Sequence, residues 1–372
     1  MEVLQYEYER LVVWKLLNEV ILMYVFLSDI HLGTKIPEEV FMDCLDYVFD
    51  IIEKSKEECH QIFVCGDLFD RRLNTHELET AAKFIVKLVC NHMRKDCGHV
   101  GVTFIHGTYS HDQEQYMIFI PMIERITGVR IRYVPSQGTF TLDNGVKVLA
   151  LPQEYGDVDY TKAFSDKYDI IIGHGPVSSE TKNPCPVGNS EILMSADLLG
   201  SISNICVFGH YHEYTDFGNN VYYTGSMLRW RYGEPSQKVF FTCDDNWKVK
   251  TYPNPFAIEY KIVECEDIDT LRKEISKDIT TPHRFVIKCS NDKDLEEIHA
   301  IVNVYKKNKN ISVRIINDKY ELKPLVQKEI APQHTIEPIP ALIAFIKDKY
   351  QVDTEAIIKD YENKIRMKEE SQ

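Results

Sequence analysis

Positive charge is in the minority in this chain of 372 residues. It has 43 lysines and arginines against 57 aspartates and glutamates, and its formal net charge is −14 with neutral histidines. Broad electrostatic capture of nucleic acid needs a basic surface, so this composition argues against it, and leaves only a local basic groove or a partner that supplies positive charge. Arg71, Arg72 and Arg229 are the candidates for local phosphate contacts, with solvated loop charges as the alternative interpretation.

Paired cysteines and long apolar runs are also lacking. None of the ten cysteines forms a C-x-x-C pair, which argues against a zinc knuckle and indicates a reducing compartment, the cytoplasm. The apolar stretch at residues 11–22 is short and contains Lys15, Asn18 and Glu19, so it predicts neither a membrane span nor a signal peptide. We expect residues 1–22 to be an extension that the fold does not need.

What the chain does have is a series of polar clusters, each placed directly after a short apolar run. The runs at 24–27, 62–65, 102–105, 170–172 and 205–208 are typical of buried strands. Ligands in open α/β folds collect at the carboxyl ends of strands, so these clusters predict a shared site. The clusters, in chain order, are Asp29-Ile30-His31, Gly66-Asp67, His111-Asp112, Gly173-His174 and Gly209-His210-Tyr211-His212.

The segment at residues 23–252 alternates between strand-like and helix-like patterns and is expected to form the first domain. Apolar residues recur at helical spacing in 38–54 and 76–93, and further strands are predicted at 129–134, 138–142 and 146–150. Two more follow the fifth cluster, at 221–223 and 239–241. Strands of this kind after a parallel α/β half predict two sheets packed face to face with helices outside.

Three further segments follow this domain. Residues 253–320 read as strand, helix, strand, helix, strand, without any metal-type cluster, and predict a small α+β domain with either a structural or a substrate-positioning role. Residues 321–338 resemble a linker. Residues 339–368 contain two amphipathic helical patterns, which either pack on this chain or dock on a partner, and we favour the partner.

The residue types in the clusters are those that hold divalent cations. Asp29 and His31 lie two residues apart at a strand end, and Asp67 has two carboxylate oxygens that could bridge two ions. His174, His210 and His212 add imidazole nitrogens. Mixed imidazole and carboxylate ligands suit Mn²⁺, Fe or Zn²⁺ better than Ca²⁺. Two such ions about 4 Å apart can clamp the oxygens of an in-line phosphoryl displacement.

These motifs resemble the signature of the calcineurin-like metallophosphoesterases. The resemblance implies an α/β/β/α sandwich with a smaller capping domain and a C-terminal helical pair. It implies two divalent ions, Mn²⁺ with Mg²⁺ as the alternative. One ion would be held by Asp29, His31, Asp67 and His212. The other would be held by Asp67, His174, His210 and one more side chain.

The third cluster departs from the family pattern. The family has Gly-Asn-His-Asp, where the asparagine is a ligand, the histidine stabilises phosphate or protonates the leaving oxygen, and the aspartate orients that histidine. This chain reads His106-Gly107-Thr108-Tyr109-Ser110-His111-Asp112. His111 and Asp112 are expected to keep the two catalytic roles. Thr108, Ser110 and His106 are the candidates to replace the missing asparagine.

A narrower resemblance is to the SbcD nuclease subunits of double-strand-break repair complexes, in the forms that large bacteriophages encode. It rests on 27–33 (LSDIHLG), 66–70 (GDLFD) and 223–226 (YTGS). It implies a DNA endo- and exonuclease for repair, recombination and replication, acting as a homodimer on double-stranded DNA ends in the host cytoplasm. The implied partner is an SbcC-type coiled-coil ATPase, bound by the C-terminal helices.

Two alternatives to the nuclease remain open. The first is a metallophosphoesterase that acts on a small-molecule phosphodiester or a phosphoprotein. The second is a scaffold for the ATPase whose altered third cluster has weakened catalysis. Two subsidiary expectations accompany the main one. Asp70 fixes a loop or supports a ligand, and Tyr109, Tyr116 or Trp230 stacks on a base, with a core role as the alternative for these aromatic residues.

Overall fold

The computed structural model describes residues 21–90, 93–94, 98–99, 101–129, 131–156, 158–184, 191–229, 232–234, 237–289, 292–308 and 310–317. The predicted linker, the predicted helical pair, Trp230 and nearly all of the N-terminal extension lie outside these residues. Among the residues described, no helix has both the length and the apolar character that crossing a membrane requires.

The described chain divides into two compact units. The larger unit runs to Met227 and also contains Lys238–Pro255, and the smaller unit contains Leu228–Gln237 and the chain from Phe256 onward. The boundary expected between residues 252 and 253 lies close to this division. The short segment from Leu228 to Gln237, which we expected in the first domain, clusters with the smaller unit.

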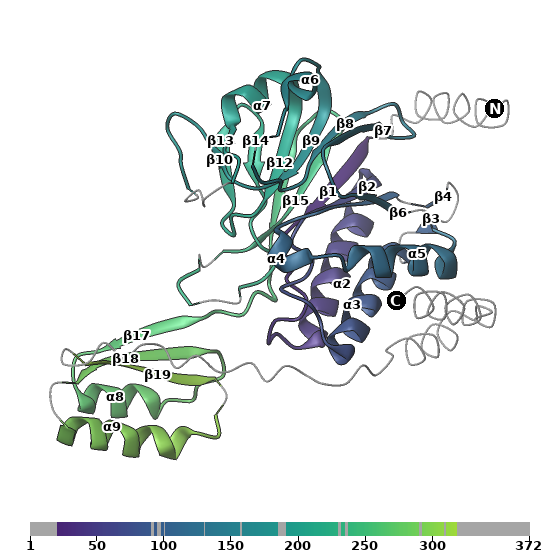
Figure 1. Cartoon of the computed structure of the whole chain (residues 1–372). Coiled ribbons are helices and arrows are strands. Elements are labelled where there is room, and N and C mark those ends of the chain that lie inside the picture. The colour runs from purple at the N-terminus through teal and green to yellow at the C-terminus, as the bar shows by residue number, and fades with distance from the viewer. Residues whose placement is uncertain are drawn as a thin grey trace, which may run out of the picture. The chain divides into compact units, whose positions relative to one another are not determined.

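The first sheet of the larger unit has six strands in the order β16-β15-β1-β2-β5-β6. Four neighbours, β1, β2, β5 and β6, are parallel, whereas β15 is antiparallel to both β1 and β16. Figure 1 shows the helices α2, α3 and α5 together on one side of this sheet. The bounds are β16 (Val249–Pro253), β15 (Val239–Asp244), β1 (Leu22–Leu27), β2 (Glu58–Cys65), β5 (Gly101–Ile105), β6 (Ile131–Val134), α2 (Glu38–Lys54), α3 (Thr75–Cys90) and α5 (Tyr116–Thr127).

The second sheet also has six strands, in the order β13-β14-β12-β9-β8-β7. Its centre is parallel, and the edge pairs β7–β8 and β13–β14 are antiparallel. Two short strand pairs, β3–β4 and β10–β11, complete the larger unit. The bounds are β13 (Thr215–Gly218), β14 (Val221–Tyr223), β12 (Ser203–Gly209), β9 (Tyr168–His174), β8 (Lys147–Leu151), β7 (Gly138–Thr141), α6 (Thr161–Phe164), α7 (Ala196–Ile202), β3 (Met93–Arg94), β4 (Gly98–His99), β10 (Val177–Ser178) and β11 (Met194–Ser195).

The core of the larger unit lies between the two sheets. Phe26 and Phe63 of the first sheet belong to one buried cluster with Ile172 and Val207 of the second. A further cluster packs α7 on the outer face of the second sheet. Every residue of β1 is buried, because this strand is covered on both faces, and this explains its continuous apolar sequence. The layers are therefore α/β/β/α, which confirms the expected fold class.

The smaller unit is a three-stranded sheet in the order β17-β18-β19 with all strands parallel. The helices α8 and α9 connect the strands, and Leu271, Phe285 and Ile298 share its buried core. Asp267 begins α8 as a side-chain cap, accepting a 2.7 Å hydrogen bond from the Thr270 amide. The bounds are β17 (Lys261–Cys265), α8 (Ile268–Ile275), β18 (His283–Cys289), α9 (Asp292–Tyr305) and β19 (Ile311–Asn317).

The loops after β1 and β2 are tied to each other, and this tie positions the site. The amides of Asp29, His31 and Leu32 donate to the carbonyls of Gly66, Asp67 and Leu68. A β-bridge between Leu32 and Phe69 extends the pairing beyond the strands. Polar side chains at the two strand ends are thereby held at a fixed separation.

Candidate metal centre

Four of the predicted ligand residues have an unusual backbone conformation. The φ angles are 48° at Asp29, 52° at His31, 47° at Asp67 and 101° at His210. Residues other than glycine rarely adopt positive φ, and such strain is concentrated at functional sites. All four residues lie within four positions of the ends of β1, β2 and β12, so the unusual backbone is found where these strands end.

Two glycines allow the ligand loops to approach one another. A Cβ atom at Gly66, where φ is +80°, would lie 2.3 Å from Nδ1 of His174. A Cβ atom at Gly107 would lie 2.2 Å from the backbone nitrogen of Asp67. Any side chain at these positions would push the ligand residues apart, so close packing of the site explains the glycines.

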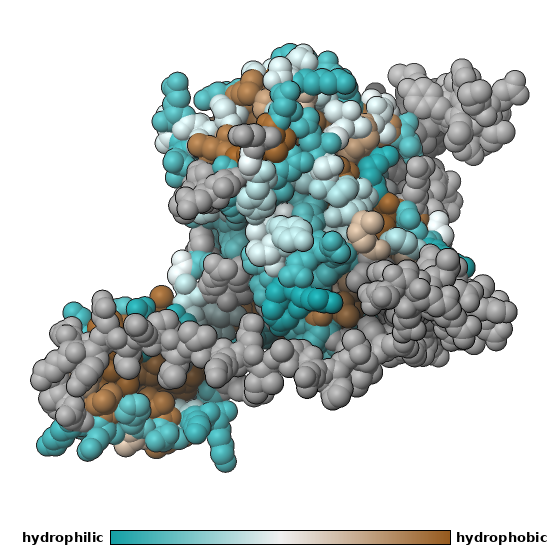
Figure 2. Space-filling model, in the orientation of Figure 1, coloured by the Kyte–Doolittle hydropathy of each residue, from teal (hydrophilic) through white to brown (hydrophobic). Residues whose placement is uncertain are grey.

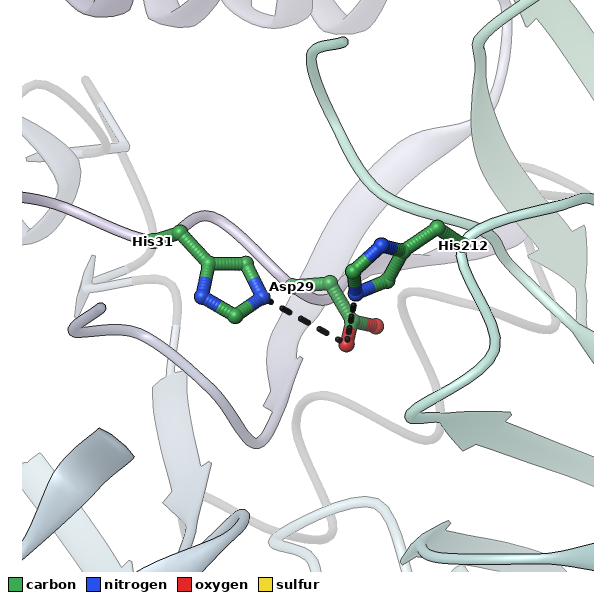
Figure 3. Close-up of side chains that lie close together, drawn as sticks. All are labelled: Asp29, His31 and His212. Carbon is green, nitrogen blue, oxygen red and sulfur yellow. Dashed lines mark ion pairs between the residues drawn. The ribbon is translucent and has the colours of Figure 1, made fainter. Parts of the chain in front are cut away.

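The first group of ligand atoms comes from Asp29, His31 and His212. Oδ1 of Asp29 lies 3.9 Å from Nε2 of His31 and 3.5 Å from Nε2 of His212 (Figure 3). Asp29 is fully buried, and both its oxygens accept hydrogen bonds from the His210 amide, at 3.1 and 3.0 Å. The carboxylate is therefore fixed by the backbone while its Oδ1 atom faces two imidazoles.

Asp67 lies between this group and a second one. Its Oδ2 atom is 3.8 Å from Nε2 of His31, and its Oδ1 atom is 3.3 Å from Nε2 of His174. Asp67 thus belongs to two candidate ligand groups, one with His31 and His111 and one with Asp29 and His174. Each oxygen of one carboxylate faces a different histidine, which is the arrangement that a bridging ligand needs.

His210 is beside these groups. Its ring centroid lies 5.4 Å from that of His174. Burial and the neighbouring His174 lower the pKa of His210, while the charges of Asp29, Asp67 and Glu191 oppose that change. The structure thus brings five of the six predicted ligands into ligand groups and places the sixth next to them.

Hydrogen bonds behind the imidazoles determine which nitrogen faces the site. Nδ1 of His174 lies 2.7 Å from the carbonyl oxygen of Cys65 and donates to it, so Nε2 is left facing Asp67. Nδ1 of His31 lies 3.5 Å from a carboxylate oxygen of Asp70, so its Nε2 faces Asp29 and Asp67. Histidines that bind metals are usually oriented in this way. Asp70 has the supporting position expected for it.

The charges of these groups are strongly coupled. Burial would raise the pKa of Asp29, but the histidines His212, His174 and His31 hold it well below its usual range. Burial likewise opposes ionisation of Asp67, yet His174 and His31 lower its pKa to about 2. Burial lowers and Asp67 raises the pKa of His174, with a net rise to about 10. Positive charge beside Asp29 and Asp67 thus favours their ionised forms, which are the forms that bind a cation.

The donor set fits divalent cations. Two ligand atoms about 2.1 Å from one ion are at most about 4.2 Å apart, and the nitrogen–oxygen distances here are 3.3 to 3.9 Å. The imidazole and carboxylate donors suit first-row transition metals. Asp29, His31, Asp67 and His212 would hold one ion, and Asp67, His174 and His210 would hold a second.

The three candidates to replace the family's asparagine differ in their surroundings. The Thr108 hydroxyl lies 3.2 Å from Oδ2 of Asp67 and 3.5 Å from Nε2 of His174. Ser110 is exposed on α4 (Tyr109–Asp112). His106 makes a 2.9 Å hydrogen bond with the Tyr133 hydroxyl. Of the three candidates, Thr108 alone is shown in contact with the ligand residues.

His111 is placed at the site, in a different setting from the one expected. Its ring is perpendicular to that of His31, with centroids 4.9 Å apart, and its Nδ1 atom hydrogen-bonds to the Asp70 carbonyl oxygen. The sequence pattern predicts that Asp112 orients His111. Neighbouring residues on a helix do not face each other, and in this structure a backbone carbonyl orients the imidazole instead.

Asp112 holds the ligand loops together. Its buried carboxylate accepts hydrogen bonds from the amides of Asp67 (3.1 Å), Phe69 (3.1 Å) and Gly107 (2.7 Å). Burial and the charge of Asp67 raise the pKa of Asp112 to about 8, against the effect of the Phe69 and Gly107 amides. The expectation that Asp112 orients His111 is corrected accordingly: it organises the loop that carries Asp67.

The substitution Asp112→Ala is expected to destabilise the fold by about 3–5 kcal/mol, because three buried amides lose their acceptor. Urea unfolding monitored by circular dichroism measures this loss, with the exposed Asp43→Ala on α2 as the control. Unfolding at the wild-type urea concentration, with only turnover reduced, would instead favour a role for Asp112 in orienting His111.

The three arginines named as phosphate contacts have different surroundings. Arg71 pairs with Glu77 at 2.7 Å and donates to the Gly33 carbonyl at 2.9 Å. Arg72 is exposed. Arg229 is buried in the smaller unit and donates to the Ile258 carbonyl at 3.2 Å. The phosphate contacts of these arginines stay predictions.

Of the aromatic residues suggested for base stacking, one is now excluded. Tyr116 is fully buried and stacks on Tyr133, with centroids 4.6 Å apart. Tyr109 is 61% exposed. The structure also adds a residue that the sequence did not suggest: Gln153, whose amide contacts Thr108. It follows β8 outside every motif, so no sequence pattern marks it.

No curated protein matches the chain. One solved structure to which it is similar is the crystal structure of TT1561 of Thermus thermophilus. The two are 9% identical with a TM-score of 0.41, over 63% of this chain and 99% of that one. The model of the calcineurin-like phosphoesterase family matches residues 22–214, just over half of the chain. With its sandwich fold and its ligand groups, the chain belongs to the calcineurin-like phosphoesterase family.

Proposed function

We propose that this protein is a divalent-metal-dependent nuclease that hydrolyses phosphodiester bonds in DNA, as a subunit of an SbcC–SbcD-like complex. The observation that carries the proposal is the position of Asp67, whose two carboxylate oxygens lie 3.8 Å from His31 and 3.3 Å from His174. A carboxylate shared in this way is the centre of a site for two cations. Mn²⁺ is the metal that we propose, with Mg²⁺ as the alternative.

When bound, the two cations would neutralise the phosphate and activate a water molecule. The protein's own residues set the geometry of that reaction. Asp29 and Asp67 are fixed by backbone amides, and the Cys65 carbonyl and the Asp70 carboxylate orient His174 and His31. His111 is held through Nδ1, which leaves Nε2 to contact the phosphate or to protonate the leaving oxygen.

Two kinds of observation support DNA as the substrate. The motifs at residues 27–33, 66–70 and 223–226 resemble those of SbcD nuclease subunits. In addition, two exposed tyrosines lie near the ligand residues. Tyr109 follows Thr108 by one residue and is 61% exposed, and Tyr155 is 43% exposed with its hydroxyl against the Tyr109 backbone. Exposed aromatic rings beside a phosphodiester site can stack on bases.

The visible face of the larger unit is largely hydrophilic. On the face of the larger unit that Figure 2 shows, hydrophilic residues predominate among those drawn in colour, with hydrophobic side chains gathered near α6 and α7. A polar surface is compatible with a nucleic acid, but the net charge of −14 provides little attraction for one. We therefore propose that a partner shares the DNA contact.

The proposed partner is an SbcC-type coiled-coil ATPase bound through residues 339–368, and the nuclease subunit would act as a homodimer on double-stranded DNA ends in the cytoplasm. The smaller unit would position the DNA, since all three candidate ligand groups of the described chain belong to the larger unit. Copurification of the ATPase with the full-length chain, and its loss on truncation after residue 334, tests the docking.

The function itself is tested by hydrolysis assays on the full-length protein in Mn²⁺. The proposal predicts cleavage of end-labelled linear duplex DNA, increased when the ATPase and ATP are added. It also predicts slower hydrolysis of bis(p-nitrophenyl) phosphate. Hydrolysis of the small phosphodiester alone, with DNA left intact in the presence of the ATPase, would contradict a nuclease.

The negative charge favours a second candidate, hydrolysis of a small-molecule phosphodiester or a phosphoprotein, because such substrates need no extended basic surface. The missing asparagine favours a third, a catalytically weakened scaffold for the ATPase. The same assays separate them: the second candidate predicts turnover of small substrates only, and the third predicts bound metal without turnover of either substrate.

A further inference from the structure

Gln153 lies beside the third cluster, from which the family's asparagine is missing. It follows β8 by two residues, and its backbone amide donates to the carbonyl of His106 at 3.4 Å, which ties it to the altered third cluster. Its side chain is 7% exposed. A glutamine buried at this place brings an amide oxygen, the same donor type that asparagine provides, to the ligand residues.

The orientation of this amide is determined by its partner Glu191. Nε2 of Gln153 donates to Oε1 of Glu191 at 2.9 Å. A carboxylate only accepts hydrogen bonds at neutral pH, so the NH₂ group must face Glu191 and the amide oxygen must face the other way. On that other side Oε1 lies 2.9 Å from the Thr108 hydroxyl.

Through Thr108 the amide oxygen reaches the second ligand group. The Thr108 hydroxyl is 3.2 Å from Oδ2 of Asp67 and 3.5 Å from Nε2 of His174, and the Thr108 amide donates to Oδ1 of Asp67 at 2.6 Å. The Thr108 hydroxyl and the Gln153 amide oxygen, both neutral, therefore lie side by side. They lie at the second cation position, to which one carboxylate, Asp67, and two histidines, His174 and His210, are assigned. A hydroxyl alone is a poor substitute for an amide oxygen in such a set.

We propose that Gln153, together with Thr108, supplies the neutral oxygen ligand of the second cation position and so replaces the asparagine of the family motif. The inference rests on the metal centre of the proposed function but not on DNA as the substrate. Glu191 is a positioning residue in this account, since it fixes the amide with its oxygen toward Thr108.

A matched control is available within the same unit. Gln61 is 5% exposed, and its amide also contacts a threonine hydroxyl, that of Thr103 at 2.9 Å. It lies on β2, where its amide also donates to the carbonyl oxygen of Ile62 at 3.3 Å, and neither Gln61 nor Thr103 is one of the assigned ligands. Replacing either glutamine by methionine keeps the side-chain length and removes the amide. The two substitutions should therefore lower the free energy of unfolding by similar amounts, whereas only Gln153→Met should affect cation binding.

The test is Mn²⁺ binding to the full-length protein, by isothermal titration calorimetry and by the electron paramagnetic resonance signal of a coupled Mn²⁺ pair. Gln153→Met is expected to weaken the second Mn²⁺ by about 10–100-fold and to remove the coupled signal, with the first ion unaffected. Gln61→Met should bind two ions as the wild type does. The double variant Gln153→Glu with Glu191→Gln, which keeps an oxygen toward Thr108 and a donor–acceptor pair between positions 153 and 191, should also retain both ions.

Three results would overturn the inference, and they differ in what else they affect. Two ions bound by Gln153→Met with wild-type affinity would remove Gln153 from the ligands and leave the proposed function intact. A single ion on the wild type would contradict a second position altogether. No bound Mn²⁺ on the wild type would overturn both the inference and the proposed function. If Gln153→Met fails to fold, loss of the second ion in the folded double variant Gln153→Glu with Glu191→Gln would decide against the inference.

Discussion

Replacement of Asp67 by asparagine is expected to reduce the turnover of bis(p-nitrophenyl) phosphate by about a thousandfold, because about 4 kcal/mol of transition-state stabilisation depends on the cation pair. The two carboxylate oxygens face His31 and His174 from opposite sides. An amide offers one oxygen in their place, and its NH₂ group would point at a cation or at an imidazole. The number of Mn²⁺ ions retained after equilibrium dialysis is expected to fall from two to at most one.

The control for this substitution is Asp169→Asn. Asp169 is a half-buried carboxylate of β9 that accepts hydrogen bonds from the Lys147 amide and from Asn204. Its replacement removes the same charge from the same unit without touching a ligand, so metal content and turnover should remain those of the wild type. Two retained ions and near-normal turnover in Asp67→Asn would refute the bridging role.

The second large effect is expected for His111→Ala. Turnover should fall by about 10²–10⁴-fold, the usual contribution of a general acid, while two Mn²⁺ ions remain bound. His111 is fixed by the Asp70 carbonyl and lies against His31, so it is near the reacting phosphate without being needed for the ligand groups of Asp29 and His174. The loss should be larger for substrates with a basic alkoxide leaving group than for bis(p-nitrophenyl) phosphate.

His76→Ala is the matched control, because His76 is an exposed histidine in α3 and lies in no candidate ligand group of the described chain. Two outcomes would change the role assigned to His111. A Mn²⁺ content that falls to one ion would make it a ligand, in line with its place in a group with His31 and Asp67. An equal loss of turnover for good and poor leaving groups would exclude proton donation to the leaving oxygen.

The strands and the ligand residues could be predicted from the sequence, because both follow from simple rules. The predicted runs 24–27, 62–65 and 102–105 became β1, β2 and β5, since strands covered on both faces must be continuously apolar. Ligand residues at the ends of parallel strands meet at one edge of a sheet. For that reason five ligand residues could be predicted from the sequence, and the structure brings them into ligand groups: Asp29, His31, Asp67, His174 and His212.

The contacts that hold the ligand residues in place could not be predicted from the sequence, because they depend on which loops meet in the fold. Asp112 and His111 are adjacent in a familiar motif, and only the turn of α4 shows that the aspartate faces the amides of Asp67, Phe69 and Gly107. Arg229 follows the fifth cluster closely but is buried in another unit. Gln153 belongs to no motif, and it reaches Thr108 from the end of a strand in the opposite sheet.

The central claim is that two divalent cations share the carboxylate of Asp67, and crystals of the full-length protein grown with Mn²⁺ test it most directly. Anomalous difference maps collected near the manganese absorption edge are expected to show two peaks about 3.5–4 Å apart on either side of this carboxylate. One peak would lie among Asp29, His31 and His212, and the other beside His174. A single peak, or two peaks that do not both lie within bonding distance of Asp67, would contradict the account.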